Sequence, residues 1–241
     1  AEKDITALSK GIKLAMENVT FQPRDVSKPI LSGVSFSIDA GSKVVITGKS
    51  GSGKSAMLAL LSGLYESYDG EVKVNDLPLE MINLDKYRSV VGDCLELQQI
   101  FHGTIGENIM VGRDIDPIQL ASLIELVGLK DFIYQLPEDM ETILLPEGRG
   151  LSRKLAQAIL LARAFVGEPR ALILENALLH VDKDIKSNVM AYLFGGNWTL
   201  VMVSQDEGVL KMATQIIVMD DGKLVYNGNQ SGYQKFLTLN S

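Results

Sequence analysis

Short apolar segments alternate with amphipathic segments along most of the chain, and their spacing predicts its secondary structure. Residues 14–21 (LAMENVTF) and 34–38 (VSFSI) are rich in β-branched and aromatic residues, and a loop containing Pro and Ser separates them. Residues of these types favour strands, because their side chains pack well on a pleated surface. Two such strands joined by a loop predict an antiparallel β layer near the N-terminus.

Three nearly continuous apolar segments predict strands that are buried on both faces. They are residues 43–48 (KVVITG), 171–175 (ALILE) and 199–204 (TLVMVS). Helical patterns lie between them at residues 55–64 and 152–165. This alternation is typical of a parallel sheet with helices packed on its faces.

Two further patterns complete an α/β fold. Residues 116–128 (DPIQLASLIELVG) follow a helical pattern that begins at an Asp-Pro pair, which suits a helix start. Residues 215–228 predict a hairpin that turns at an Asp-Gly pair. We therefore expect a single domain over residues 1–241. Within it, about 14–95 and 153–241 form the core with the β layer, and about 96–152 form a helical subdomain.

Composition and charge narrow the class of protein. The chain is 46% apolar and 22% charged, which is typical of a globular domain. Its net charge of −7 argues against nucleic acid as a partner, because phosphate backbones require clustered Lys and Arg. Cys94 is the single cysteine, so no internal disulfide forms, and we expect it to be a small core residue.

No apolar segment reaches the ~18–20 residues that a membrane-spanning helix needs. Residues 1–13 also lack the apolar centre of a secretory signal. The chain begins with Ala, which is consistent with a piece cut from a longer polypeptide whose membrane segments lie upstream.

The strongest chemical motif is a phosphate-binding loop. The segment between the strand at 43–48 and the helix at 55–64 matches G-x-x-x-x-G-K-[ST] at every fixed position. Its glycines allow backbone N–H groups to turn toward phosphate oxygens, and the helix that follows directs its positive end at the same anion. The predicted ligand residues are Gly48, Lys49, Ser50, Gly51, Ser52, Gly53, Lys54 and Ser55.

Two residues of this loop have separate roles in the prediction. Lys54 is expected to pair with the β- and γ-phosphates of a nucleotide. Ser55 is expected to place its hydroxyl on the Mg²⁺ that bridges those phosphates. The loop alone does not decide between kinases, GTPases, helicases and transport ATPases.

Further segments of the sequence decide between these classes of nucleotide-binding protein. They are MENVTF (16–21), PILSGVSFSI (29–38), NLDKYRSVV (83–91), IFHGTIGENI (100–109), LPEDMETILLPEGRGLS (136–152), ILLARAF (159–165) and IIVMDDGKLVYNG (216–228). In this order they resemble the nucleotide-binding domains of ABC transporters, above all exporters whose membrane and nucleotide parts share one chain. The resemblance implies a P-loop NTPase fold of the ABC type, with a parallel core sheet, an antiparallel β layer and a helical insert.

The resemblance also implies ligands, partners and a location. Domains of this family bind ATP and Mg²⁺ and pair head to tail, so that each ATP lies between one domain's phosphate loop and the other's LSGGQ signature. We therefore expect ATP, Mg²⁺, transporter membrane domains and a second nucleotide-binding domain, identical or different. The expected location is the cytoplasmic face of the inner membrane. No nucleic acid is expected.

The signature is the first departure from the family pattern. Leu151, Ser152, Arg153 and Lys154 stand where LSGG is expected. Ser152 remains, and the family pattern gives it a bond to the γ-phosphate across the dimer. Both glycines are lost, so side chains occupy the space that close backbone approach requires. Arg153 and Lys154 either supply charge to the phosphate or form a solvated helix start.

Residues expected around the γ-phosphate depart as well. Glu175 and Asn176 stand where the family has Asp-Glu, and Glu96 falls on the family's glutamine before the insert. Glu175 and Glu96 still offer carboxylates to Mg²⁺. Asn176 cannot accept a proton from the attacking water, which removes a contribution typically worth ~10²–10⁴-fold in rate. Gln205 stands at the switch histidine and cannot carry a positive charge.

Two other positions differ. The aromatic residue that stacks on adenine in the family is replaced by Pro23. Phe21 or a residue further along that loop could take its place, but Phe21 is expected to be a core residue. The D-loop segment, Leu179-His180-Val181-Asp182, retains only its closing Asp.

These departures gather around one phosphate, so we infer loss of hydrolysis with retention of fold and of ATP binding. Two alternatives stay open. One is a slow ATPase that uses Glu175 or Glu96 as its base, and the other is a purely structural half of a transporter. Lys54 and Ser55 argue against the structural alternative, since a scaffold needs no intact phosphate loop. Asn176 favours binding over catalysis.

Overall fold

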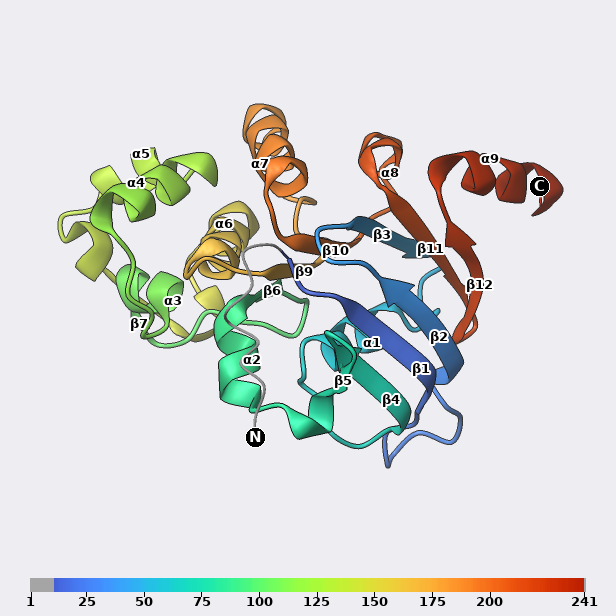
Figure 1. Ribbon diagram of the computed structural model, residues 1–241. Coiled ribbons are helices and arrows are strands. Elements are labelled where there is room, and N and C mark those ends of the chain that lie inside the picture. The colour runs from blue at the N-terminus through green and yellow to red at the C-terminus, as the bar shows by residue number, and fades with distance from the viewer. Residues whose placement is uncertain (1–10, 241) are drawn as a thin grey trace.

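The fold is known from a computed structural model that describes residues 11–240. It contains a six-stranded sheet, a four-stranded antiparallel sheet and a two-stranded ribbon (Figure 1). In spatial order the six-stranded sheet contains β12 (Lys223–Gly228), β11 (Gln215–Asp220), β3 (Lys43–Gly48), β10 (Thr199–Val203), β9 (Ala171–Glu175) and β6 (Val91–Cys94). Neighbouring strands in it are parallel except for the β11–β12 hairpin, as the apolar strands and the Asp-Gly turn predict.

The antiparallel sheet confirms the predicted β layer and extends it. Its order is β2 (Leu31–Ile38), β1 (Leu14–Phe21), β4 (Asp69–Val74) and β5 (Leu77–Pro78). The strand predicted at 34–38 already begins at Leu31. The sequence patterns did not indicate β4, since only Val72 and Val74 in this polar strand are buried.

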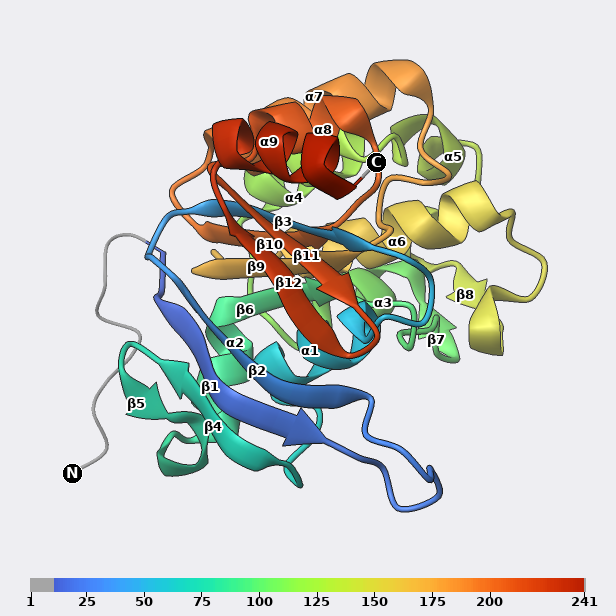
Figure 2. The same cartoon turned by 90° about the vertical axis from the view of Figure 1, so that its right-hand side faces the viewer.

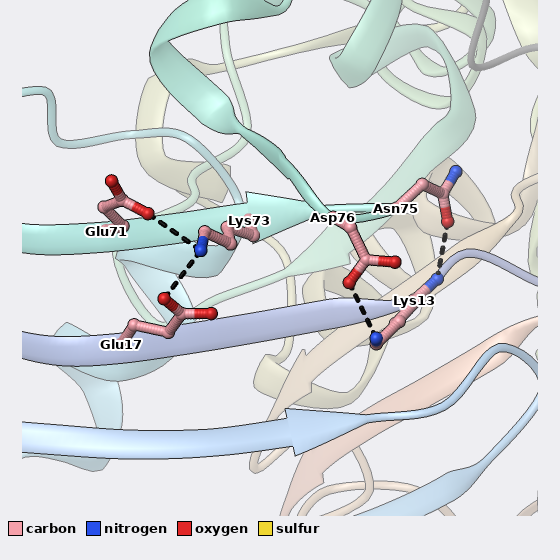
Figure 3. A network of polar contacts seen from close by, with 6 residues as sticks. All are labelled: Lys13, Glu17, Glu71, Lys73, Asn75 and Asp76. Carbon is pink, nitrogen blue, oxygen red and sulfur yellow. Dashed lines mark hydrogen bonds and ion pairs between the residues drawn. The ribbon is translucent and has the colours of Figure 1, made fainter.

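Surface ion pairs connect β1 to β4 (Figure 3). The ammonium of Lys73 lies 2.6 Å from Glu17 and 2.9 Å from Glu71. Beside it, Asn75 and Asp76 form the two-residue turn to β5, both with positive φ, as a tight hairpin requires. Exposed pairs of this kind contribute little to stability, so the sheet depends on its buried face.

Helices cover both faces of the six-stranded sheet. Helix α1 (Lys54–Leu61) lies between it and the antiparallel sheet, whereas α7, α8 and α9 lie on the opposite face (Figure 2). The bounds of the other α-helices are α2 (Leu84–Val90), α3 (Ile105–Met110), α4 (Pro117–Leu126), α5 (Lys130–Tyr134), α6 (Arg153–Phe165), α7 (Lys183–Gly195), α8 (Glu207–Met212) and α9 (Gln230–Asn240). Short 3₁₀ turns occur at η1 (Leu79–Met81), η2 (Asp139–Glu141) and η3 (Pro146–Gly148).

The core consists of two apolar clusters, one on each face of the central sheet, because side chains alternate along a strand. On β9, Ile173 belongs to the cluster that contains α1, and Leu172 and Leu174 belong to the cluster under the opposite helices. Cys94 is buried in the second cluster, and Phe21 is buried in the first, 4.8 Å from the ring of Tyr65. Both residues are therefore core residues, as expected.

Residues 96–152 contain α3, α4, α5 and the ribbon of β7 (Gly103–Thr104) and β8 (Ile143–Leu144). These elements lie at the left in Figure 1, beside α6. Helix α4 begins as predicted, with the Asp116 side chain accepting a hydrogen bond from the backbone N–H of Gln119. The division of the chain at 96 and 152 stays a prediction.

No helix within residues 11–240 is both long and apolar enough to cross a membrane. Most of the N-terminal stretch in which we expect no secretory signal, residues 1–10, lies outside the described residues.

Candidate phosphate-binding site

The predicted phosphate loop connects the end of β3 to the start of α1. Three of its glycines have positive φ, with values of 138° for Gly48, 77° for Gly51 and 96° for Gly53. A Cβ on Gly48 would lie 2.1 Å from the carbonyl oxygen of Met219, and one on Gly53 would lie 2.8 Å from that of Ile30. The loop therefore needs glycine at these two positions, for close packing as well as for backbone conformation.

The ammonium of Lys54 folds back over the loop. It donates hydrogen bonds to the carbonyl oxygens of Gly48 (2.9 Å) and Lys49 (2.6 Å) and contacts the hydroxyl of Ser52 at 3.3 Å. Burial lowers the pKa of Lys54, and the nearby carboxylates of Glu175 and Glu96 oppose that shift. The charge expected to meet a phosphate is thus held beside the loop by the loop's own backbone.

A cavity of about 340 Å³ lies beside the loop. Its polar lining includes Ser50 and Lys54 from the loop side, Asn176 after β9, and Gln205 after β10. Parallel strands end at the same edge of a sheet, which is why these sequence-distant residues meet. Ser55 is exposed in the first turn of α1, and it is not among the residues that line this cavity.

Glu96, Glu175 and Asn176 form a hydrogen-bonded group. Glu175 ends β9 with only 5% of its surface exposed, and its Oε2 accepts a hydrogen bond from the backbone N–H of Glu96 at 3.1 Å. The Asn176 amide donates to the Glu96 carboxylate at 2.6 Å. Asn176 has φ 49°, a left-handed conformation that asparagine tolerates better than most residues.

Gln205 lines the same cavity as Asn176. Its amide donates to the Gly48 carbonyl oxygen at 3.1 Å, so the residue at the predicted switch position contacts the phosphate loop directly. The next residue, Asp206, accepts hydrogen bonds from the backbone N–H groups of Gly208 and Val209 and so caps α8. Lys186 pairs with Asp206 at 2.6 Å and is the main reason that the pKa of Asp206 is lowered.

The signature segment lies elsewhere. Ser152 is the N-cap of α6, and its hydroxyl accepts from the backbone N–H of Leu155 at 3.3 Å. Lys154 forms an ion pair with Asp182, the retained residue of the D-loop segment. Arg153 lines a second cavity, of about 280 Å³, together with Glu96, Glu175 and Asn176. Arg153 is thus the signature residue that lines this cavity together with the predicted metal ligands Glu96 and Glu175.

The donor set suits Mg²⁺ rather than a metal enclosed by protein. No cluster of three or more His, Cys, Asp or Glu residues suited to holding a metal occurs within residues 11–240. Mg²⁺ is usually held by one or two carboxylates together with substrate phosphates and water. The oxygen donors of Ser55, Glu175 and Glu96 fit that pattern.

Sequence reasoning missed two residues that line the first cavity, Lys186 and Asp206. The signal for Asp206 was present, because an Asp directly before Glu-Gly after an apolar strand is a helix N-cap pattern. Lys186 has no local signal, since α7 brings it to the cavity only through the tertiary fold.

Comparisons with known proteins agree with this geometry. The family model described as "ABC transporter" matches residues 31–178. The "ABC-type transmembrane transporter verA" of Clonostachys rogersoniana is 32% identical, over 96% of this chain and 19% of its own length. The "Multidrug efflux ATP-binding/permease protein" of Mycobacterium bovis is 31% identical, over 91% of this chain and 18% of its own length.

A solved structure supports the same assignment. The protein described as "a bacterial Atm1-family ABC exporter with ATP bound" superposes with a TM-score of 0.85 and 25% identity, over 98% of this chain and 42% of its own. The chain thus spans about a fifth of the two transporters and less than half of the solved exporter chain. By family match, similarity and fold, it belongs to the ABC transporter family, as a nucleotide-binding domain of the exporter type.

Proposed function

We propose that this domain binds Mg-ATP at residues 48–55 and hydrolyses it weakly or not at all. The observation that carries the proposal is the phosphate loop, whose glycines have the required conformations and whose Lys54 already lies beside it. Backbone N–H groups and the positive end of α1 provide the rest of the anion site, and neither depends on the altered residues.

The metal ligands in this proposal are Ser55, Glu175 and Glu96. When bound, Mg²⁺ neutralises charge on the phosphates that it bridges. Glu175 is buried and its carboxylate is held by the backbone of Glu96, so the protein fixes its position before any metal arrives. Asn176 stands at the position of the expected base, and its amide has no basic lone pair that could accept a proton from the attacking water.

The test is a paired measurement on the purified chain, namely equilibrium binding of Mg-ATP and steady-state phosphate release. We expect saturable ATP binding with turnover close to the background rate. Turnover above the background rate that is lost on changing Glu175 or Glu96 would support the alternative of an ATPase that uses one of these carboxylates. Lack of ATP binding would support the purely structural alternative.

We further propose that the domain acts at the cytoplasmic face of the inner membrane, on membrane domains of the same polypeptide, and pairs head to tail with a second nucleotide-binding domain. The small fraction of the relatives that this chain covers supports a larger polypeptide. In such a pair, one site uses this chain's Asn176 and Gln205, and the other uses its Ser152. A partner with complete catalytic residues restores catalysis only at the site that contains Ser152 of this chain.

This arrangement predicts unequal sites in a heterodimer. ATP stays at the site formed by this chain's phosphate loop, while turnover occurs at the other site. Counting trapped nucleotide in the assembled transporter during turnover tests it. Equal exchange at both sites contradicts the unequal scheme, and no turnover at either site favours a role driven by binding or a structural one.

A further inference from the structure

Asn176 lies between two cavities. It lines the cavity of about 340 Å³ together with Ser50, Lys54 and Gln205, and it also lines the cavity of about 280 Å³ that contains Glu96 and Arg153. The side chain is half-buried at the end of a fully buried strand. Its amide is therefore placed to contact a ligand on the first side while a protein group holds it from the second.

The hydrogen bond to Glu96 fixes which way the amide faces. A carboxylate only accepts hydrogen bonds, so the group that lies 2.6 Å from Glu96 Oε1 must be the NH₂ of Asn176 and not its oxygen. Glu96 is itself fixed through its backbone N–H, which donates to the buried Glu175 carboxylate. The second N–H of the Asn176 amide has no hydrogen-bond partner within residues 11–240.

The first cavity has the electrostatic character of an anion site. The charged side chains that line it are Lys54, Lys186 and Asp206, and the last two form an ion pair with each other. The ammonium of Lys54 forms no ion pair within residues 11–240, and the carboxylates of Glu175 and Glu96 act on it from outside this lining. The amide of Gln205 adds a second neutral donor beside the loop. A carboxylate at position 176 would place a negative charge in this cavity, whereas the amide adds a donor.

We propose that Asn176 is a binding residue for the terminal phosphate of a nucleoside triphosphate, and that Glu96 is the positioning residue that aims its amide at that phosphate. This inference rests on the proposed nucleotide-binding function and deepens it. The hydrogen bond from Asn176 to the terminal phosphate makes the site selective for a nucleoside triphosphate over a diphosphate. Glu96 accepts the hydrogen bond through Oε1, so its other oxygen remains available to the metal.

The experiment measures Kd for Mg-ATP and for Mg-ADP on the same preparation of each variant of the 241-residue chain. The ratio of the two constants is the readout, because a partly unfolded fraction weakens both nucleotides equally and cancels. The variants are Asn176→Ala, Asn176→Asp, Glu96→Gln and Glu96→Ala. The control is Glu138→Gln, which changes an exposed glutamate of the helical region.

We expect the preference for ATP to fall at least ~10-fold in Asn176→Ala, the effect of losing one hydrogen bond to a charged group. Asn176→Asp should lower it further, because a carboxylate repels the terminal phosphate. Aspartate also tolerates the left-handed backbone conformation at this position, so the chain should still fold.

The two Glu96 variants separate positioning from charge. Both remove the negative charge, but glutamine keeps an oxygen that accepts from Asn176 and alanine does not. We therefore expect Glu96→Gln to keep a preference for ATP several times stronger than that of Glu96→Ala, also when both nucleotides are measured without Mg²⁺, where metal ligation by residue 96 plays no part. A merely electrostatic role of Glu96 predicts the same ratio for both.

The outcomes distinguish failure of the proposed nucleotide-binding function from failure of the role proposed for Asn176. If the unmodified chain binds neither nucleotide, the proposed function fails and this inference fails with it. If it binds ATP and Asn176→Ala leaves the ratio unchanged, the inference alone is wrong. Equal ratios in Glu96→Gln and Glu96→Ala, with an effect of Asn176→Ala, overturn the positioning role of Glu96.

Discussion

The phosphate loop and the altered residues around it are built on different principles. Contacts of the loop are made by backbone atoms, by glycine conformations and by one lysine. The altered residues, Glu96, Asn176 and Gln205, act through the functional group that each side chain carries. A backbone site survives changes in its surroundings, but exchanging a carboxylate for an amide reverses the direction of a hydrogen bond.

The largest expected effect is a shortfall in the turnover that a restored carboxylate recovers. Asn176→Glu alone should raise ATP hydrolysis less than ~10-fold, although a general base typically contributes ~10²–10⁴-fold. Gln205 and the signature remain altered in this variant, and residues that act as a unit do not contribute additively. Phosphate release at saturating Mg-ATP, with Glu138→Gln as control, checks it. Robust ATP hydrolysis by the unmodified chain, abolished by changing Glu175, would contradict this prediction. It would show that the altered residues around the loop still support catalysis.

The next effect is on ATP affinity. Lys54→Ala should weaken binding by at least ~1.5–3 kcal/mol, because a charge-assisted contact to phosphate is lost. Equilibrium titration of Mg-ATP measures the change. The matched control is Lys130→Ala on α5, whose exposed ion pair with Glu125 should leave affinity unaffected. Unchanged affinity in Lys54→Ala would show that the loop does not bind phosphate in this chain.

A smaller effect should separate two glycines of the loop. Gly48→Ala should lower the free energy of unfolding by more than ~1–3 kcal/mol, since its Cβ would clash with the Met219 carbonyl and its φ is 138°. Gly51→Ala meets open space and should cost only the ~1–2 kcal/mol of a left-handed residue. Denaturant unfolding of both variants gives the comparison, and equal destabilisation would contradict the packing argument.

The smallest expected effect is on acid stability. The pKa of Asp206 is lowered in the folded chain, mainly by its hydrogen bond to Lys186. The stabilisation is therefore fully present above the pKa of an unfolded aspartate and is lost as the pH falls through the lowered value. Asp206 is exposed, so the effect is modest. Asp206→Asn should flatten the acid limb of a stability–pH profile, and an unchanged slope would argue against it.

Much of the fold followed from local sequence patterns, and the reasons differ by element. The buried strands β3, β9 and β10 were predicted with bounds within one residue, because a strand between two helical layers is apolar along its whole length. β4 was missed because it is polar and gains its place through pairing with β1.

In the candidate site, too, local segments could be predicted from the sequence, whereas contacts between distant residues could not. The segment of the phosphate loop could be identified as a whole, since it is continuous in the sequence, and its binding of phosphate stays a prediction. The hydrogen bond between Asn176 and Glu96 joins positions that are distant in the sequence, and nothing local to either residue indicates it. Ser152 was expected to face a partner's nucleotide, and that role stays a prediction.

The contact between the phosphate loop and the β11–β12 hairpin has a consequence for biosynthesis. Gly48 packs against Met219, and the Gly222 N–H donates to the Ser52 carbonyl oxygen at 3.2 Å. The loop is synthesised well before the hairpin that supports it, because the hairpin lies far downstream in the sequence. A nascent chain that ends before Gln215 therefore lacks a supported loop, and ATP should assist folding of this domain only after the hairpin has formed.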